Sequence, residues 1–438
     1  LSASSRGTGK NMSESNPMAG SNSSFLKGRY SAEKRFKLYG VFAVSLALGA
    51  VIFLLFTIFS TGYSAFWRTE FQVEIQFNGD YLGITQESSD QEVREANFLG
   101  LFRKNLAEQN NDVPRRELRK LFAMFSESAA DDLREMVITN RSILGTTQKL
   151  KVLASSSVDM IVKGQAPREI EEKRRVLNDF QLGLLDRWTA EGRRSSSFNH
   201  RFFTNGDSRS PELAGLGGAI AGSFWTLMVC LILSFPMGVA AAIYLEEYAP
   251  KNRLTEIIEV NINNLAAVPS IIFGLLGLAV ILNFFGLPRS TPLVGGIVLS
   301  LMTLPTIIIA CRASLKAVPP SIREGALAMG ASKMQTILHH VLPLAMPGTL
   351  TGTIIGLAQA LGETAPLLMI GMFAFVVDIP AGPLESATAL PVQVYLWAES
   401  SERGYVELTA AGIMMILIFM ALMNSFAIIL RKKFERRW

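Results

Sequence analysis

The sequence is poor in the residues that most often carry chemistry, with only two cysteines and three histidines among 438 residues. Cys230 and Cys311 form neither a CxxC pair nor a disulfide framework. His200 stands alone, while His339 and His340 are adjacent, so on a helix they face different sides and make a poor metal pair. We therefore predict no metal site.

Motifs of nucleotide-binding and catalytic proteins are missing as well. No G-x-x-x-x-G-K-[ST] occurs, so the chain lacks a phosphate-cradling loop of its own for ATP. H-E-x-x-H and G-x-S-x-G are also absent. We therefore expect that the chain is not an enzyme and binds no cofactor itself.

Charge is scarce over several stretches that are long enough to cross a membrane. Hydrophobic residues make up 49% of the chain, and its mean hydropathy is +0.29. A membrane-spanning helix needs roughly 20 apolar residues, and about six runs meet that requirement. They are residues 38–62, 214–245, 260–288, 290–311, 347–377 (interrupted by Glu363) and 408–430.

Lysine and arginine gather before the first run, after the last one, and in the linkers after the second and the fourth. By the positive-inside rule both chain termini are cytoplasmic. Contact of these basic residues with membrane lipid explains them better than a nucleic-acid site does. The length of the first run suits a retained anchor better than a signal peptide.

These patterns divide the chain into five parts. Residues 1–37 are expected to be a disordered, basic, cytoplasmic segment, 38–62 the first span, and 63–213 a soluble extracytoplasmic domain. Residues 214–430 hold five spans and a cytoplasmic loop, 313–346, and residues 431–438 form a basic tail. Pro236, Pro269, Pro305 and Pro366 interrupt these spans, as breaks do in transporters, although ordinary helix kinks would look the same.

The polar stretch 63–213 has patterns of both strands and helices. "EFQVEIQF" at 70–77 alternates polar and apolar residues, which predicts a half-buried strand. The stretches 94–109 and 167–188 carry apolar residues at helical spacing. The predicted architecture is therefore an all-α polytopic membrane protein with an inserted α+β domain.

The segment 318–348 is too polar for a span but shows clear helix signals. Ser321 with Glu324 and Ser332 with Gln335 each fit a capping box, and Gly330 stands where a helix C-terminus favours a positive φ. An apolar face follows, which consists of Met334, Ile337, Leu338 and Val341. This second helix is expected to end at Leu342-Pro343. We predict two short cytoplasmic helices joined at a glycine, with a face for docking to a partner.

"EGALAMGASKMQTILHHVLP" resembles the EAA loop of importer-type ABC permeases, in which a helix seats in a groove of the cytoplasmic ATPase. The matching residues are Glu324, Ala326, Gly330, Leu342 and Pro343, and the chain departs from the pattern at Gly325 and His340. The resemblance implies that Ser321 to Pro343 couples the chain to a partner ATPase, which uses ATP and Mg²⁺.

"NLAAVPSIIFGLLG" at 264–277 and "ALGETAPLL" at 360–368 resemble the phosphate-specific (Pst) permeases, the PstA-type subunit in particular. This implies a type I ABC importer permease fold in the bacterial inner membrane. The implied partners are a PstC-type sister permease, two copies of a PstB-type ATPase and a PstS-type periplasmic phosphate-binding protein. A permease for another oxyanion or small solute, and a membrane sensor that relays an external signal, are the alternatives.

Three polar residues in or beside the spans are candidates for the substrate path. Glu363 is expected near the middle of the fifth span, where an ionisable group is costly and often functional. Arg312 ends the fourth span and is either an interfacial anchor or a bidentate phosphate ligand. Gln359 stands where the family resemblance leads us to expect arginine. Glu363 is predicted to pair with an arginine or to accept the proton of phosphate.

Overall fold

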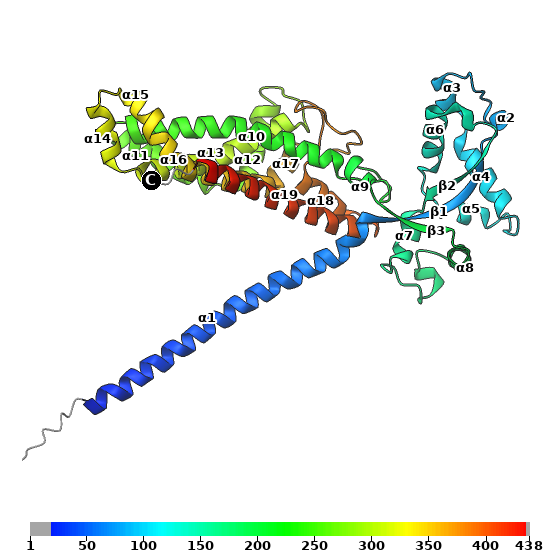
Figure 1. The fold of residues 1–438 in the computed structure, drawn as a ribbon, viewed down its shortest axis with the longest axis horizontal. Coiled ribbons are helices and arrows are strands. Elements are labelled where there is room, and N and C mark those ends of the chain that lie inside the picture. Colours follow the sequence, from blue (N-terminus) through cyan, green and yellow to red (C-terminus); the bar gives the residue numbers. More distant parts are fainter. Residues whose placement is uncertain (1–18, 435–438) are drawn as a thin grey trace, which may run out of the picture. The chain divides into compact units, whose positions relative to one another are not determined.

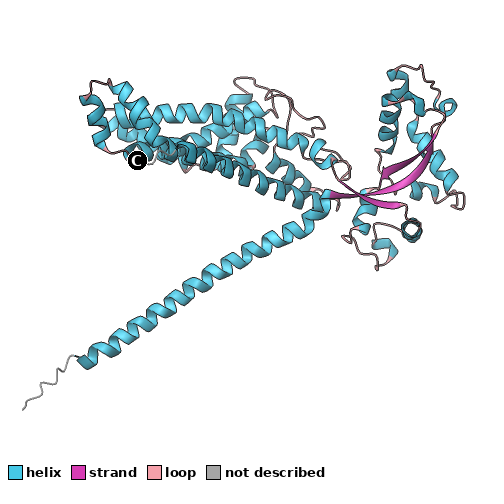
Figure 2. Ribbon diagram, in the orientation of Figure 1, coloured by secondary structure: helices cyan, strands magenta, loops and turns pink. Residues whose placement is uncertain are grey.

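The computed structural model describes residues 19–434; residues 1–18 and 435–438, from the predicted N-terminal segment and basic tail, lie outside the described part. Helices make up most of the chain, and the three strands all belong to the stretch between the first two spans (Figures 1 and 2). The described residues divide into two units, one that ends at Thr57 and one that begins at Ile58.

Helix α1 (Ala19–Gly62) contains the predicted first span and begins well before it. The disorder expected for residues 1–37 therefore does not extend over the described residues 19–37. Alanine, glutamate, lysine and arginine, which favour helices, are frequent in residues 32–37. In addition, Lys37 Nζ lies 3.0 Å from Glu33 Oε1, one turn away on the same face.

Five helices of the described chain are long and apolar enough to cross a membrane, and a bent pair raises the number to as many as six. The bent pair is α11 (Arg253–Ala266) and α12 (Ser270–Leu276), the latter continued by the π-helix η5 (Gly277–Leu282), with an angle of 101° between them. The predicted third span, 260–288, is thus not one straight helix. Pro269 explains the break, because proline lacks an N–H and its ring clashes with the carbonyl four residues earlier.

The remaining helices of the described membrane part are connected by short segments, except that residues 370–389 separate α17 from α18. These helices are α10 (Gly217–Ile243), η4 (Tyr244–Tyr248), α13 (Pro292–Lys316), α14 (Pro320–Ala328), α15 (Lys333–Thr336), η6 (Ile337–Val341), α16 (Leu342–Gly362), α17 (Ala365–Met369), α18 (Leu390–Glu399) and α19 (Tyr405–Phe434). Gly238 of α10 faces Ile307 of α13, and Gly352 of α16 lies against Ala310, so α13 packs against both neighbours through small residues. Pro236 and Pro305 lie inside continuous helices and do not interrupt their spans.

The predicted fifth span, 347–377, ends much earlier than expected. Helix α16 stops at Gly362, and Glu363 follows it in an extended conformation with φ −80° and ψ 109°. Glu363 is therefore not in the middle of a span. Pro366 accounts for the end, since an uninterrupted helix would bring its ring against the carbonyl of Gly362.

Residues 63–213, called the inserted segment below, contain a three-stranded antiparallel sheet in the order β2-β1-β3. Strand β1 (Trp67–Gln76) lies between β2 (Thr147–Leu153) and β3 (Arg194–Phe198), with Val73 opposite Leu150. The helical elements are η1 (Tyr63–Phe66), α2 (Gly79–Leu82), α3 (Asp90–Glu95), α4 (Phe98–Gln109), α5 (Leu118–Phe122), α6 (Ala129–Thr139), η2 (Arg141–Ile143), α7 (Ser156–Val162), η3 (Glu172–Arg174), α8 (Asp179–Ala190) and α9 (Arg201–Thr204). Figure 1 shows α2 to α6 gathered around the strands.

The strand predicted at 70–77 is confirmed, and its alternation decides which face is buried. Phe71, Val73 and Ile75 are buried, whereas the residues between them are exposed. Phe71 packs edge-to-face against Trp188 of α8, with ring centroids 5.1 Å apart. The helix expected over 167–188 begins only at Asp179, because Asn178 and Gln181 form a capping box at that point.

Phe71→Ala should lower the free energy of unfolding of the inserted segment by about 3–5 kcal/mol, because it removes a fully buried ring and leaves a cavity. Gln72→Ala, at an exposed position of the same strand, is the matched control. Hydrogen exchange of the β1 amides in the detergent-purified chain measures both changes. Equal protection in the two variants would show that Phe71 is not part of the core.

Candidate functional site

Two breaks in the membrane helices lie against each other. The first separates α11 from α12 around Pro269, and the second separates α16 from α17 at Glu363 and Thr364. A Cβ atom at Gly274 of α12 would lie 2.6 Å from Pro366 Cα of α17, so only glycine allows this approach. The stretches 264–277 and 360–368, far apart in the sequence, therefore meet in the fold.

Apolar side chains surround this contact. Phe273 of α12, Leu361 of α16 and Leu367 of α17 belong to one buried cluster with Val298 of α13. Discontinuous helices are tolerated at membrane depth only where protein or a water-filled cavity covers the interrupted backbone. Transporters place substrate sites at such interruptions, and we therefore take the paired breaks as the candidate site in the membrane part.

The three residues predicted for the substrate path are not brought together. Gln359 is exposed on α16, and Glu363 is half-buried beyond its end. Helices α13 and α16 run antiparallel, with Ala310 beside Gly352. At a rise of 1.5 Å per residue, this register puts Arg312 and Glu363 roughly 20 Å apart along the helices.

Arg312 is instead neutralised by two carboxylates from neighbouring elements. Its Nη2 atom lies 2.5 Å from Glu259 Oε1 of α11, and its Nε atom lies 3.5 Å from Glu246 Oε2 of η4. The Arg312 side chain is only 14% exposed. In this conformation Arg312 therefore joins α13 to α11 and η4 and presents no free charge to an anion.

The segment 318–348 differs in part from its prediction. Helix α14 begins at Pro320, with Pro319 as its N-cap, so Ser321 is a helical residue and the predicted capping box with Glu324 is absent. Proline favours the first helical position because its missing N–H would have no partner there, which explains the earlier start. Gly330 has a φ of +86°, as expected, and the second capping box, Ser332 with Gln335, is present.

The predicted helix end at Leu342-Pro343 is wrong. Residues Lys333–Gly362 form one apolar helical run, in which α15 passes through the π-helix η6 into α16. A π-helical turn is wider than an α-helical one and gives the Pro343 ring room beside the preceding carbonyls. The predicted apolar face divides as well, because Ile337 and Val341 are buried while the other two residues are exposed.

The base of the 318–348 segment is fixed, whereas its tip is exposed. Arg323 donates to Glu247 Oε1 at 2.8 Å and to the carbonyls of Val318 and Leu315 at 2.8 and 2.9 Å. Helix α14 has no buried residue. Large apolar side chains are exposed around the Gly330 joint; they are Leu327, Met329, Met334 and Leu338. The tip therefore offers an apolar surface of the kind that docks to a protein partner. The sequence reasoning missed Arg323, because its carboxylate partner is 76 residues away.

A second polar cluster joins the inserted segment to α19 and was also missed. Glu407, in the first turn of α19, is 8% exposed. Its carboxylate lies 2.9 Å from Lys163 Nζ and accepts hydrogen bonds from Ser64 Oγ at 2.8 Å and Gln165 Nε2 at 2.6 Å. Lys163 also lies 2.5 Å from Asp159 Oδ2. Buried charges need such partners, so this cluster fixes the inserted segment to the last apolar helix.

Family profiles match two parts of the chain. Residues 234–438 match the "Binding-protein-dependent transport system inner membrane component" family. This matched range includes both helix breaks. Residues 23–172 match a "Domain of unknown function (DUF3333)".

Curated relatives are similar over about half of the chain. The probable ABC transporter permease protein YqgI of Bacillus subtilis (strain 168) is 30% identical over 40% of this chain and 58% of its own length. The probable ABC transporter permease protein YqgH of the same strain is 33% identical over 43% of this chain and 62% of its own length. The phosphate transport system permease protein PstA of Yersinia pestis is 33% identical over 50% of this chain and 73% of its own length. The chain thus spans less than two thirds of the first two relatives.

Lys163→Met should destabilise the junction between the inserted segment and α19 by about 3–5 kcal/mol, because it leaves the buried Glu407 carboxylate without its cation. Glu407→Gln in the same chain should recover part of this loss by removing the unpaired charge. Hydrogen exchange at residues 63–76 and 405–410 provides the free energy of local opening for the double-mutant cycle. Additive effects of the two substitutions would contradict the coupling.

Proposed function

Because the chain belongs to the PstA-type, binding-protein-dependent ABC transport permeases, we propose that it forms the translocation path of an ATP-driven phosphate importer together with a sister permease. The packing of the two helix breaks, Gly274 against Pro366, is the observation that carries this proposal. Both breaks fall in the region that matches the family, and transporters use interrupted helices to build substrate sites.

The partners follow from the same premise. A PstC-type permease completes the path, two copies of a PstB-type ATPase supply ATP hydrolysis, and a PstS-type external protein delivers phosphate. The complex lies in the bacterial inner membrane with both termini of this chain in the cytoplasm and the inserted segment outside. The basic residues that flank the apolar runs support this orientation.

Gln359 and Glu363 are the proposed contributions of this chain to the path. Gln359 is exposed on α16 and can donate a hydrogen bond to an oxyanion, while Glu363 can accept the proton that phosphate retains near neutral pH. Arg312 joins the path only in a state that releases it from Glu246 and Glu259. The paired state corresponds to a closed path with the phosphate-binding cation withheld.

The exposed tip of the 318–348 segment is the proposed ATPase contact. Its residues of predicted function are Ser321, Glu324, Gly325, Ala326 and Gly330, which lie on α14 or at the joint after it. The absence of buried side chains in α14 and the exposed apolar residues around Gly330 support docking. Leu342 and Pro343 lie farther along, inside the continuous helix, and transmit the movement of the tip to the membrane part.

Transport is tested in vesicles that contain this chain, the sister permease, the ATPase and the external phosphate-binding protein. We expect ATP-dependent phosphate uptake that sulfate does not inhibit, because sulfate has no proton to donate to Glu363. Glu363→Gln should reduce uptake by about tenfold or more, since hydrogen bonds to charged groups contribute about 1.5–3 kcal/mol. Asp378→Asn, an exposed acid after α17, is the control for the lost charge.

The wild-type complex and the Glu363→Gln variant test two different parts of the proposal. No uptake by the wild-type complex would exclude phosphate import. Normal uptake by the Glu363→Gln variant, still resistant to sulfate, would exclude Glu363 as the proton acceptor.

Gly330→Val should uncouple ATP hydrolysis from transport, because a β-branched residue does not adopt a φ of +86° without strain and the α14–α15 joint must rearrange. ATP hydrolysis should persist while phosphate uptake falls about tenfold, a change of about 1.4 kcal/mol. Gly286→Val provides the matched control, because Gly286 also has a positive φ (66°) and lies outside the segment. Coupled uptake by the Gly330→Val variant would contradict the role of the joint.

A further inference from the structure

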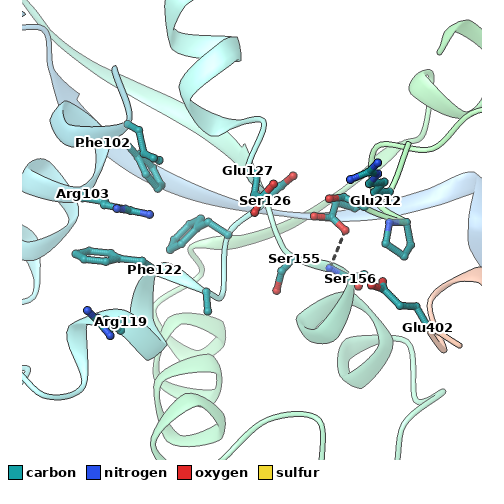
Figure 3. Close-up of a pocket in the computed structure, with 16 residues that line it drawn as sticks. Phe102, Arg103, Arg119, Phe122, Ser126, Glu127, Ser155, Ser156, Glu212 and Glu402 are labelled. Carbon is teal, nitrogen blue, oxygen red and sulfur yellow. Dashed lines mark hydrogen bonds between the residues drawn. The ribbon is translucent and has the colours of Figure 1, made fainter. Parts of the chain in front are cut away.

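A cavity of about 640 Å³ lies between helices of the inserted segment and two stretches of chain that lead into α10 and α19, the first of which is the end of the inserted segment itself (Figure 3). Helices α4 and α5 provide one wall, Ser155 and Ser156 at the start of α7 provide another, and the linkers contribute residues 209–212 before α10 and Glu402 before α19. A water molecule occupies about 30 Å³, so the cavity is far larger than a single oxyanion requires. Its volume falls within the roughly 300–1,000 Å³ that is typical of ligand pockets.

The lining of this cavity carries charges of both signs, from three arginines (Arg103, Arg119 and Arg209) and three glutamates (Glu127, Glu212 and Glu402). Arg103 and Arg119 lie on one side with Phe122 between them, and Glu212 and Glu402 lie on the other (Figure 3). None of these four charged side chains takes part in an ion pair within the described chain. The Arg103 guanidinium lies over the Phe122 ring, 5.6 Å from its centroid, which holds it at the cavity wall.

Two polar groups on the side of Glu212 and Glu402 can interact with a ligand. Glu212 accepts a hydrogen bond from the Ser156 backbone N–H at 3.3 Å, and burial raises the pKa of its carboxyl group. A cation placed beside Glu212 would offset the cost of ionising it there. The Ser155 Oγ atom is buried and has no hydrogen-bond partner, although Ser155 lines the cavity. Both groups favour a ligand with a cationic, hydrogen-bonding part on this side.

We propose that the cavity receives a surface segment of the external phosphate-binding protein, with a carboxylate directed to Arg103 and Arg119 and a lysine or arginine directed to Glu212 and Glu402. This inference rests on the proposed function, which requires such a protein to dock on the outer side of the complex. The docked segment would contact the inserted segment and the linkers that enter α10 and α19 at once. A cavity with charges of both signs selects the orientation of its partner through electrostatic complementarity.

The test measures the dissociation constant of the phosphate-binding protein for the complete complex in lipid nanodiscs. Arg103→Glu with Arg119→Glu should weaken binding by about tenfold or more, because the reversed charges repel the partner's carboxylate. Arg115→Glu with Arg116→Glu makes the same change in net charge at exposed positions outside the cavity lining and is the matched control. Glu402→Lys should also weaken binding; it is an exposed linker position, so the inserted segment keeps its fold.

Equal losses in the cavity variant and the control variant would overturn the inference, because they would show only a general effect of charge. Unchanged binding in the Glu402→Lys variant, or no binding by the wild-type complex, would overturn it as well. These outcomes are separate from phosphate uptake. A complex that imports phosphate but binds its external protein equally well in all variants leaves the proposed function intact and excludes this docking site.

Discussion

The membrane part of the chain depends on one constraint: backbone N–H and C=O groups inside a bilayer need partners within the protein. Two proline residues, Pro269 and Pro366, interrupt helices in this part and leave backbone groups without helical partners. The fold answers by placing the two interruptions against each other, with Gly274 allowing the closest approach. Helix α13 covers them from one side through Val298, which packs against Gly277.

Local signals in the sequence predicted local structure well. Residues close together in the sequence determine three features that were predicted correctly. They are the capping box at Ser332, the positive φ of Gly330 and the alternating strand β1. Other local signals were misread, because Pro320 starts α14 before Ser321 can cap it, and Pro269 and Pro366 break two of the predicted spans. Pro343 looked like a helix end because a local pattern does not reveal a π-helical turn before it.

For the charged residues, the sequence revealed unusual positions but not the partners of those residues. Arg312 and Glu363 stood out in the sequence because charge is rare in apolar runs, and both were predicted to line the substrate path. The sequence contains no signal that Glu259 lies 2.5 Å from Arg312, or that Glu407 and Lys163 meet across 244 positions of the chain. The role of a buried or half-buried charge depends on such partners, and only the fold brings those partners together.

The continuous helical run Lys333–Gly362 has a mechanical consequence. At 1.5 Å per residue these 30 residues span about 45 Å, longer than the roughly 30 Å hydrocarbon core of a bilayer. One end carries the exposed Met334, and the other end stops at Glu363, beside the paired helix breaks. The run can therefore act as a lever, in which a small tilt applied to the exposed tip displaces the interrupted backbone at the far end.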